Sequence, residues 1–121
     1  MSNRIDEFSD VLYTGRQYTI EQTALFADWL DRLSDRSGRI RILKRLSRLA
    51  AGNFGDVKSV GDGVSEMRMF FGPGYRAYYM LKDEIVLLLL AGGDKDSQVR
   101  DIARAKDLAR KVRDGNQDNT L

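Results

Sequence analysis

The stretch GVSEMRMFFGPGYRAYY at residues 63–79, followed by LLLLAGGDKDSQ at residues 87–98, decides the architecture of this chain. It predicts two β-hairpins that share a middle strand. Hydrophobic and polar side chains alternate over residues 64–71, which is the period of a half-buried strand, and the Gly-Pro-Gly turn at residues 72–74 ends that strand. The continuous apolar run at residues 85–91 is too short to cross a membrane and is typical of a central strand buried on both faces.

The length of the Gly-Pro-Gly turn fixes which side chains lie opposite each other, because the turn sets the register of a hairpin. A three-residue loop places Phe70 opposite Arg76. It also places Arg68 opposite Tyr78. These four side chains then share the expected polar face of the sheet, with Glu66 at its rim. The face assigned to the core carries Met67, Met69, Ala77 and Tyr79.

The second hairpin is expected to turn at residues 83–84, an acidic pair. A two-residue turn there places Ala91 opposite Arg76. Residues 92–95 then leave the sheet as a corner beside Arg76, which brings Lys95 close to it.

The composition limits the chemistry that the chain can support. With 121 residues, the chain has the size of one domain with a single hydrophobic core. It contains no cysteine and no histidine, which excludes disulfides, thiol nucleophiles, thiolate metal sites and histidine acid–base catalysis. Neither a P-loop nor an acidic cluster with two-metal spacing is present, so no metal or cofactor is expected. No stretch reads as a signal peptide or a membrane span, so we expect a cytoplasmic protein without a membrane partner.

One domain is expected at residues 17–113, between a mobile N-terminal arm at residues 1–16 and a disordered tail at residues 114–121. Residues 17–21 predict a short edge strand. A helix is predicted to begin after Thr23, which suits an N-cap. Its apolar face carries Phe26, Trp29, Leu30 and Leu33, so Trp29 is expected in the core.

A second helix is predicted after a turn at Ser37 and Gly38, and it extends to about Ala51. Its apolar stripe is Ile42, Leu43, Leu46 and Leu49, and its opposite face carries Arg41, Lys44, Arg45 and Arg48. Residues 32–48 hold seven Lys or Arg and one Asp, whereas the whole chain has a net charge of only +2. Two interpretations of the row of cations stay open: a solvated surface, or a ridge that binds nucleic-acid phosphates.

A short strand at residues 57–60 and a final helix after Lys95 complete the pattern. Candidates for the N-cap of that helix are Asp94, Asp96 and Ser97. Its expected buried stripe is Ile102, Ala105, Leu108, Ala109 and Val112, and a separate face carries Arg100 and Arg104.

Three motifs in this order carry a family resemblance: GVSEMR at residues 63–68, GPGYRAYY at residues 72–79 and GGDKDSQ at residues 92–98. With them, the chain resembles the addiction-module killer proteins, the HigB-like branch of the RelE/ParE toxin superfamily. The resemblance extends from about residue 23 to residue 112. It implies a small α+β, RelE-like fold: a central, mostly antiparallel twisted sheet of about four to five strands, with two N-terminal helices packed on it and a C-terminal helix.

The resemblance also implies a function. Such a protein is the toxin of a type II toxin–antitoxin module, and it inhibits translation as a metal-independent, ribosome-dependent mRNA endoribonuclease, or mRNA interferase. In these toxins, cations on a concave sheet face bind RNA, and a ribose 2′-hydroxyl attacks the neighbouring phosphate. The implied partners are a cognate helix-turn-helix antitoxin, mRNA and the ribosome, with no small-molecule cofactor.

The implied catalytic residues are Arg76, Lys95, Arg68 and Glu66. Arg76 matches the arginine of the family's Gly-Tyr-Arg motif and is expected to stabilise negative charge in the transition state. Arg68 is unsuited to act as a base, because an arginine stays protonated at any working pH. We therefore expect Lys95 to transfer the proton and Glu66 to orient Arg68.

Base recognition departs from the family's pattern. The aromatic residue that related toxins place early in the last helix has no match here, so Phe70 or Tyr78 is expected to stack on a base. The full set expected to bind nucleic acid is Arg41, Lys44, Arg45, Arg48, Phe70, Tyr78, Arg100 and Arg104.

Other interpretations remain open. A member of the same superfamily can be a ParE-like poison of DNA gyrase, which binds a protein and need not cleave anything. A third possibility is a non-catalytic partner that helps an antitoxin bind operator DNA. The residues alone, without the resemblance, favour arginines that pair with carboxylates such as Glu66 on an exposed sheet face.

Overall fold

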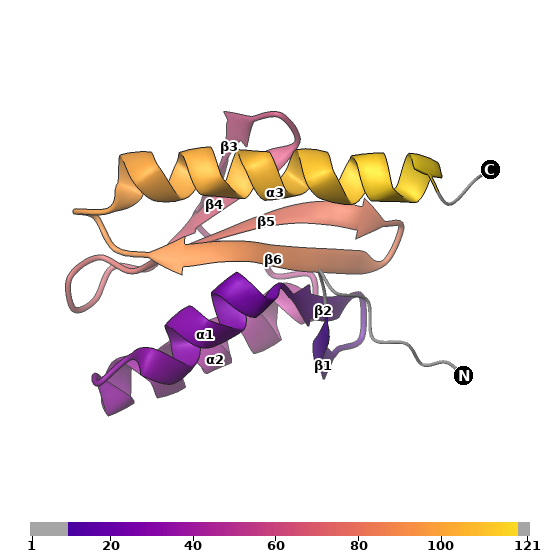
Figure 1. Cartoon of the computed structure of the whole chain (residues 1–121). Coiled ribbons are helices and arrows are strands. Elements are labelled where there is room, and N and C mark those ends of the chain that lie inside the picture. Colours follow the sequence, from indigo (N-terminus) through magenta and orange to yellow (C-terminus); the bar gives the residue numbers. More distant parts are fainter. Residues whose placement is uncertain (1–9, 119–121) are drawn as a thin grey trace.

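The computed structural model describes residues 10–118, with side chains described up to residue 115. The chain forms six strands and three helices in that part (Figure 1). The strands are β1 (Asp10–Thr14), β2 (Thr19–Gln22), β3 (Val57–Gly61), β4 (Val64–Arg68), β5 (Arg76–Asp83) and β6 (Val86–Gly93). The helices are α1 (Ala24–Arg32), α2 (Arg36–Ala50) and α3 (Gln98–Asp118).

All six strands belong to one mixed sheet, in the order β1-β2-β6-β5-β4-β3. Neighbouring strands are antiparallel except for β2 and β6, which are parallel. In Figure 1, α1 and α2 lie on one face of the sheet and α3 crosses the other, so the molecule has three layers. Helices therefore cover both faces of the sheet, as the long apolar run of β6 requires.

The predicted fold is wrong in its strand number and arrangement. The sheet has six strands, with two of them before the first helix, whereas four to five strands with two N-terminal helices were expected. The first of these strands, β1, lies within the range expected to be a mobile arm. It pairs with β2 and forms the outer edge of the sheet. Leu12 packs against the first core, whereas its neighbours Val11 and Tyr13 are exposed. At the other end of the chain, α3 continues to Asp118 through much of the expected tail.

Two hydrophobic cores lie on opposite faces of the sheet. The first, between the sheet and α1 and α2, contains Phe26, Ile42, Met67, Met69, Ala77 and Tyr79. The second, between the sheet and α3, contains Val64, Tyr78, Leu88, Leu90, Ala105 and Ala109. The prediction of Met67, Met69, Ala77 and Tyr79 as core residues is therefore confirmed. The opposite face, expected to be polar and open, is largely buried.

The first hairpin has a longer connection than predicted. Arg68 pairs with Arg76, and the Met69 amide donates to the Tyr75 carbonyl at 2.9 Å, so the three-residue loop is wrong. The register differs from the predicted one by two residues, and side chains alternate with a period of two, so each one keeps its predicted face. Gly72 and Gly74 have φ values of 57° and 79°, a backbone conformation that glycine adopts readily.

The second hairpin also departs from the predicted register, by two residues at Arg76 and by one residue at Tyr79–Leu81, between two irregularities of the pairing. Its turn is at residues 84–85, and Arg76 pairs with Gly93 in place of Ala91. Gly92 and Gly93 therefore belong to β6 and not to a corner outside the sheet. A Cβ on Gly92 would lie 2.2 Å from the Trp29 ring, so this glycine lets α1 approach the strand closely.

The helix starts illustrate how local signals work. Thr23 caps α1 as predicted, since its Oγ1 accepts a hydrogen bond from the Phe26 amide at 3.1 Å. The turn predicted at Ser37 and Gly38 is wrong, because α2 already begins at Arg36 with Asp35 as its N-cap. The Asp35 carboxylate accepts a hydrogen bond from the Gly38 amide at 2.9 Å.

None of the described helices is long and apolar enough to cross a membrane.

Candidate nucleic-acid interface

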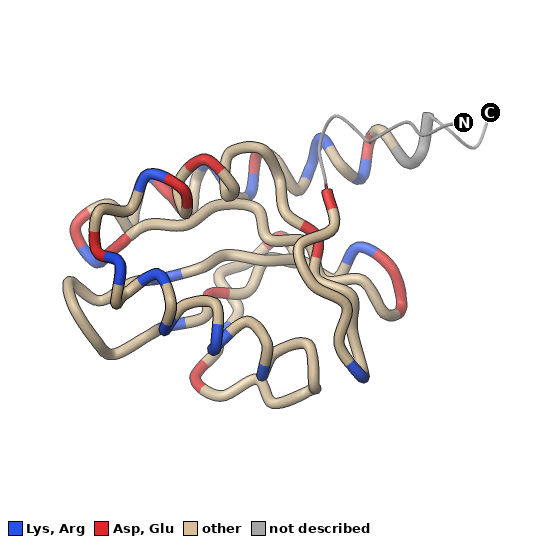
Figure 2. The backbone as a smooth tube through the Cα atoms, turned by 90° about the horizontal axis from the view of Figure 1, so that it is seen from below, with Lys and Arg blue, Asp and Glu red and all other residues tan. Residues whose placement is uncertain are grey.

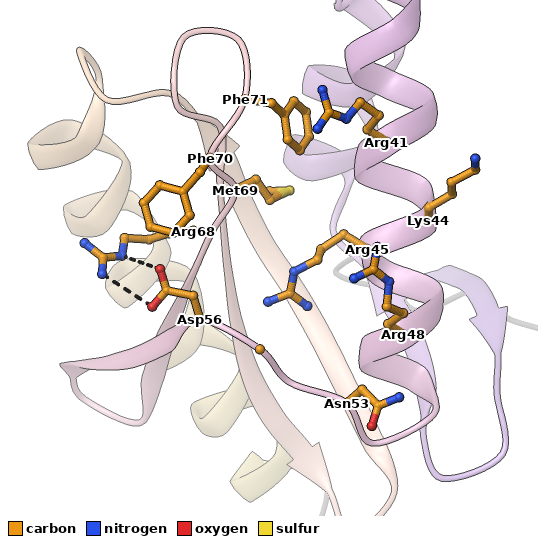
Figure 3. A pocket seen from close by; sticks show the side chains of 11 residues that line it. Arg41, Lys44, Arg45, Arg48, Asn53, Asp56, Arg68, Met69, Phe70 and Phe71 are labelled. Carbon is orange, nitrogen blue, oxygen red and sulfur yellow. Dashed lines mark hydrogen bonds and ion pairs between the residues drawn. The ribbon is translucent and has the colours of Figure 1, made fainter.

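A groove of about 470 Å³ lies between α2 and the end of β4, on the α1–α2 side of the sheet (Figure 3). It is lined by Arg41, Lys44, Arg45 and Arg48 of α2, by Asn53, Gly55 and Asp56 of the following connection, and by Arg68, Met69, Phe70 and Phe71. Five of these side chains carry a positive charge and one carries a negative charge. Figure 2 marks the positions of Lys and Arg along the backbone, seen from below the view of Figure 1. We call this feature the cationic groove.

The cations of α2 differ in their freedom to bind a ligand. Arg41 stacks over the Phe71 ring, with 4.0 Å between its guanidinium carbon and the ring centroid. Arg45 donates a hydrogen bond to the Phe54 carbonyl and lies over Gly55, where a Cβ would collide with it. Burial, and then repulsion from Arg48, lowers the pKa of Arg45, although a guanidinium remains charged at working pH. Arg45 therefore fixes the connection after α2, while Arg41, Lys44 and Arg48 are exposed at the groove.

The other wall of the cationic groove is organised by Arg68. Its guanidinium contacts both oxygens of Asp56, with distances of 3.1 Å from Nε and 3.3 Å from Nη2. The Phe70 ring lies beside it, with its centroid 5.4 Å from the guanidinium carbon. Sequence analysis missed Asp56, because a lone Asp after a Gly-containing loop gives no signal until Arg68 is placed opposite it.

A hydrogen bond between Tyr75 and Asp35 connects this wall to the start of α2. The Tyr75 hydroxyl donates a hydrogen bond to Asp35 at 2.8 Å, and the Tyr75 ring packs edge-on against Phe71 and Trp29. Burial, followed by the hydrogen bond to Asp35, raises the pKa of Tyr75 to about 12. The loop that carries Phe70 is thereby held in a fixed position relative to the cations of α2.

Glu66 does not lie at an open rim. Its side chain is fully buried between the sheet and the first turn of α3, where its Oε2 accepts hydrogen bonds from the Tyr78 hydroxyl at 3.0 Å and the Gln98 amide at 2.8 Å. The Nε of Arg76 lies 3.5 Å from the same oxygen. Burial, and then the charge of Glu66, raises the pKa of Tyr78 above its usual range. This buried cluster takes Glu66 and Tyr78 out of contact with any ligand in this conformation.

Arg76 lies mostly within the protein, since 11% of its side chain is exposed. Its Nη1 donates to the Gly74 carbonyl at 2.9 Å. A Cβ on Gly74 would lie 3.4 Å from Arg76 Nη1 and 3.6 Å from Lys95 Cβ, so Arg76 and Lys95 flank the same turn. Arg68 pairs with Arg76 across β4 and β5. The structure thus gathers Arg68, Arg76 and Lys95 around the loop that carries Phe70, although only Arg68 lines the cationic groove.

The remaining residues predicted to bind nucleic acid lie elsewhere. Arg100 and Arg104 are exposed on α3, which covers the opposite face of the sheet from α2 (Figure 1). Arg100 also lies 3.7 Å from the buried carboxylate of Asp101. The structure therefore divides the predicted set: the α2 cations and Phe70 line the cationic groove together with Arg68; Arg100 and Arg104 lie on α3; and Tyr78 is buried. Among the described residues, no three acidic side chains lie where they could jointly hold a metal ion.

The chain is similar to a Haemophilus influenzae protein that carries the name "Uncharacterized protein". The two are 43% identical over 93 residues, which cover 77% of this chain and 94% of the relative. The chain belongs to the same family as that protein. A stretch of 93 residues within 121 must include residues 29–93, so the family likeness covers every residue that lines the cationic groove. No family model and no solved structure matches the chain.

Proposed function

We propose that this protein is the toxin of a type II toxin–antitoxin module and that it inhibits translation by cleaving mRNA on the ribosome without a metal ion. The observation that carries the RNA-binding part is the cationic groove, in which one carboxylate is matched by five cations. The nuclease part rests on the three motifs shared with the HigB-like killer proteins. Our proposal places the toxin in the cytoplasm with a helix-turn-helix antitoxin as its partner.

The charge of the groove favours a phosphate backbone as its ligand. Solvated protein surfaces usually mix both signs of charge. From Arg36 to Gly55, the chain instead has six Lys or Arg and no Asp or Glu. A nucleic acid that binds such a row releases condensed counterions, and this release supplies much of the binding free energy. The guanidinium groups of Arg41 and Arg48 add bidentate hydrogen bonds to phosphate oxygens.

Cleavage by 2′-hydroxyl attack needs a group that stabilises the doubly negative phosphorane, together with a proton acceptor and a proton donor. Arg76 and Lys95 flank Gly74, and Arg76 pairs across the sheet with Arg68, so their charges suit the first requirement. In our proposal Lys95, which is exposed, transfers a proton. The buried Glu66 acts as a positioning residue that holds Arg76.

The test is induced expression in a bacterial host, followed by primer extension on cellular mRNA. We expect growth arrest and breaks in mRNA that follow the codon phase. The variant Lys44→Gln/Arg48→Gln should reduce both effects. Its control is Arg110→Gln/Lys111→Gln, which removes the same charge from α3, where both side chains lie beside Asp107. The control should arrest growth as the wild-type protein does.

Two outcomes would replace the proposal. An SOS response with intact mRNA would identify a poison of DNA gyrase instead. Normal growth with intact mRNA, together with tighter operator binding by a co-expressed antitoxin, would identify a non-catalytic partner.

A further inference from the structure

Phe70 is exposed in a way that its neighbours are not. Its side chain is 77% exposed at the rim of the cationic groove, and it belongs to neither hydrophobic core. The next residue, Phe71, packs against the first core, between Arg41 and Tyr75. Of two adjacent phenylalanines, one therefore holds the loop to the protein and the other presents its ring to solvent (Figure 3).

Two hydrogen bonds hold the loop that carries the Phe70 ring. The loop after Phe70 is closed by the hydrogen bond from the Gly74 amide to the Phe71 carbonyl at 3.1 Å. The Tyr75–Asp35 hydrogen bond then fixes the loop to α2. A loop held in this way loses little further backbone freedom when a ligand binds, so the position of Phe70 is favourable for recognition.

The surroundings of Phe70 define the chemistry of a suitable ligand. A flat aromatic surface at the rim calls for a flat partner, and the cations at Arg41, Lys44 and Arg48 call for several negative charges in a row. These three side chains follow one another at intervals of three and four residues, which places neighbouring ones about 5–6 Å apart along the helix. A single nucleic-acid strand offers both features, whereas the bases of a duplex are already paired and stacked.

We propose that the cationic groove binds a single-stranded segment of RNA, with one unpaired base stacked on Phe70 and the adjoining phosphates along Arg41, Lys44 and Arg48. This inference rests on the proposed function and assigns the stacking role to Phe70, since the other candidate, Tyr78, is fully buried. The Arg68 guanidinium lies over one face of the Phe70 ring, and Asp56 holds it in place, so the base stacks on the other face. Stacking of this kind accepts any base, so Phe70 contributes affinity and strand type more than sequence preference.

The test measures fluorescence anisotropy of a short labelled RNA without secondary structure, alone and annealed to its complement. The purified full-length protein should bind the single strand more tightly than the duplex. Phe70→Ala should weaken single-strand binding by roughly tenfold to a hundredfold, the expected effect of losing one stacked base. Phe70→Trp should restore it. The control Val99→Ala removes an apolar side chain that is also exposed, 85% on α3, and should bind as the wild-type protein does.

A second probe isolates the base from the backbone. Replacing each nucleotide of the RNA in turn by an abasic residue keeps every phosphate, so one abasic position should weaken binding to wild-type protein but not to Phe70→Ala. Wild-type affinity in Phe70→Ala, or equal affinity for single strand and duplex, would overturn the inference. So would a failure of the wild-type protein to bind the single strand. The proposed function is decided separately, by the breaks in cellular mRNA.

Discussion

The carboxylate of Glu66 and the guanidinium of Arg76 form an ion pair, 3.5 Å from Oε2 to Nε, beneath the first turn of α3. Glu66 is fully buried, and Tyr78 and Gln98 donate hydrogen bonds to the same carboxylate oxygen. Together these contacts tie β4, β5 and α3 to each other. The pair therefore has a structural role in addition to whatever Arg76 does with a ligand.

We expect Arg76→Ala to destabilise the protein by about 3 kcal/mol, the low end for breaking a buried ion pair, because it removes the nearer of two cations and leaves the buried carboxylate with Lys58 alone, whose Nζ is 4.0 Å from Oε1. Urea denaturation followed by circular dichroism measures the effect. The control Arg32→Ala breaks an exposed ion pair with Asp28 and should change stability by less than about 1 kcal/mol. A fully stable Arg76→Ala variant would show that the ion pair contributes nothing to the fold. Arg76→Lys, which keeps the charge, is the better variant for assays of activity.

A second prediction concerns Gly93, where β6 lies under the start of α3. A Cβ there would lie 1.8 Å from Asp101 Oδ2, and the Ser97 hydroxyl donates a hydrogen bond to that same oxygen. Gly93→Ala must therefore displace the first turn of α3, and we expect a loss of about 1–3 kcal/mol in the free energy of unfolding.

The matched control is Gly115→Ala, since nothing lies within 4 Å of a Cβ at that position in α3. It should stabilise the protein by up to about 1 kcal/mol, because alanine has the higher helix propensity. Thermal unfolding distinguishes the two changes by their opposite signs. Equal stability of Gly93→Ala and the wild-type protein would mean that α3 moves away from the sheet without penalty.

The helices were predictable because their signals are local. The Thr23 cap and the apolar stripe of α3, with Ala105, Ala109 and Val112 buried, are contained within a few turns of sequence. The position of β2 was not predictable in this way. Ile20 pairs with Leu87, a partner 67 residues away, and nothing in a four-residue strand specifies a parallel neighbour. The predicted strand number was accordingly wrong, and so was the edge position expected for residues 17–21, because β2 lies between β1 and β6.

The candidate site was predictable to a similar extent. The helical period placed Arg41, Lys44 and Arg48 on one side of α2, and the strand period placed Arg68 and Arg76 on one face of the sheet. The period of a strand does not tell which face another helix will cover. Because α3 covers that face, Glu66 and Tyr78 became buried, and the groove formed next to α2, where Arg68 at the end of β4 reaches Asp56.

A third prediction, on stability at alkaline pH, follows from the hydrogen bond between Tyr75 and Asp35. The pKa of Tyr75 is about 12 in the folded protein, compared with an ordinary value of 10. The unfolded chain therefore loses this proton at lower pH than the folded protein, so the stabilisation is complete below pH 10 and is lost as the pH rises through 12. Tyr75→Phe should show a shallower loss of stability in this range.

Urea denaturation at a series of alkaline pH values measures both proteins. Tyr78 and Tyr79, whose pKa values are also raised, remain in Tyr75→Phe, so part of the slope should persist. An identical slope in the two proteins would show that the Tyr75 hydroxyl has the same proton affinity in the folded and unfolded states.

A fourth prediction follows from the positive charge of α2. Each phosphate contact that is lost should reduce the slope of log K against log salt concentration by about one. Lys44→Gln/Arg48→Gln should therefore bind single-stranded RNA more weakly and with a slope smaller by about two. The charge-matched change on α3, Arg110→Gln/Lys111→Gln, should leave the slope unchanged. A reduced slope in both variants would indicate a general effect of net charge and not a site on α2.

The last prediction separates charge from proton transfer at Lys95. Lysine and arginine both carry a positive charge, but an arginine does not release its proton at working pH, whereas a lysine can. Lys95 is exposed and flanks Gly74 together with Arg76, so an arginine fits there without disturbing either core. We expect Lys95→Arg to bind RNA with wild-type affinity. Its rate of mRNA cleavage should fall by at least about a hundredfold, which is the low end of the loss typical for removing an acid–base group. Cleavage on purified ribosomes across a range of pH measures the rate, and RNA anisotropy provides the binding control.

If Lys95→Arg instead cleaves at the wild-type rate with the same pH profile, Lys95 acts through its charge alone. Asp56 would then be the group to test next, because it is the carboxylate that lines the cationic groove, whereas Glu66 is enclosed beneath α3.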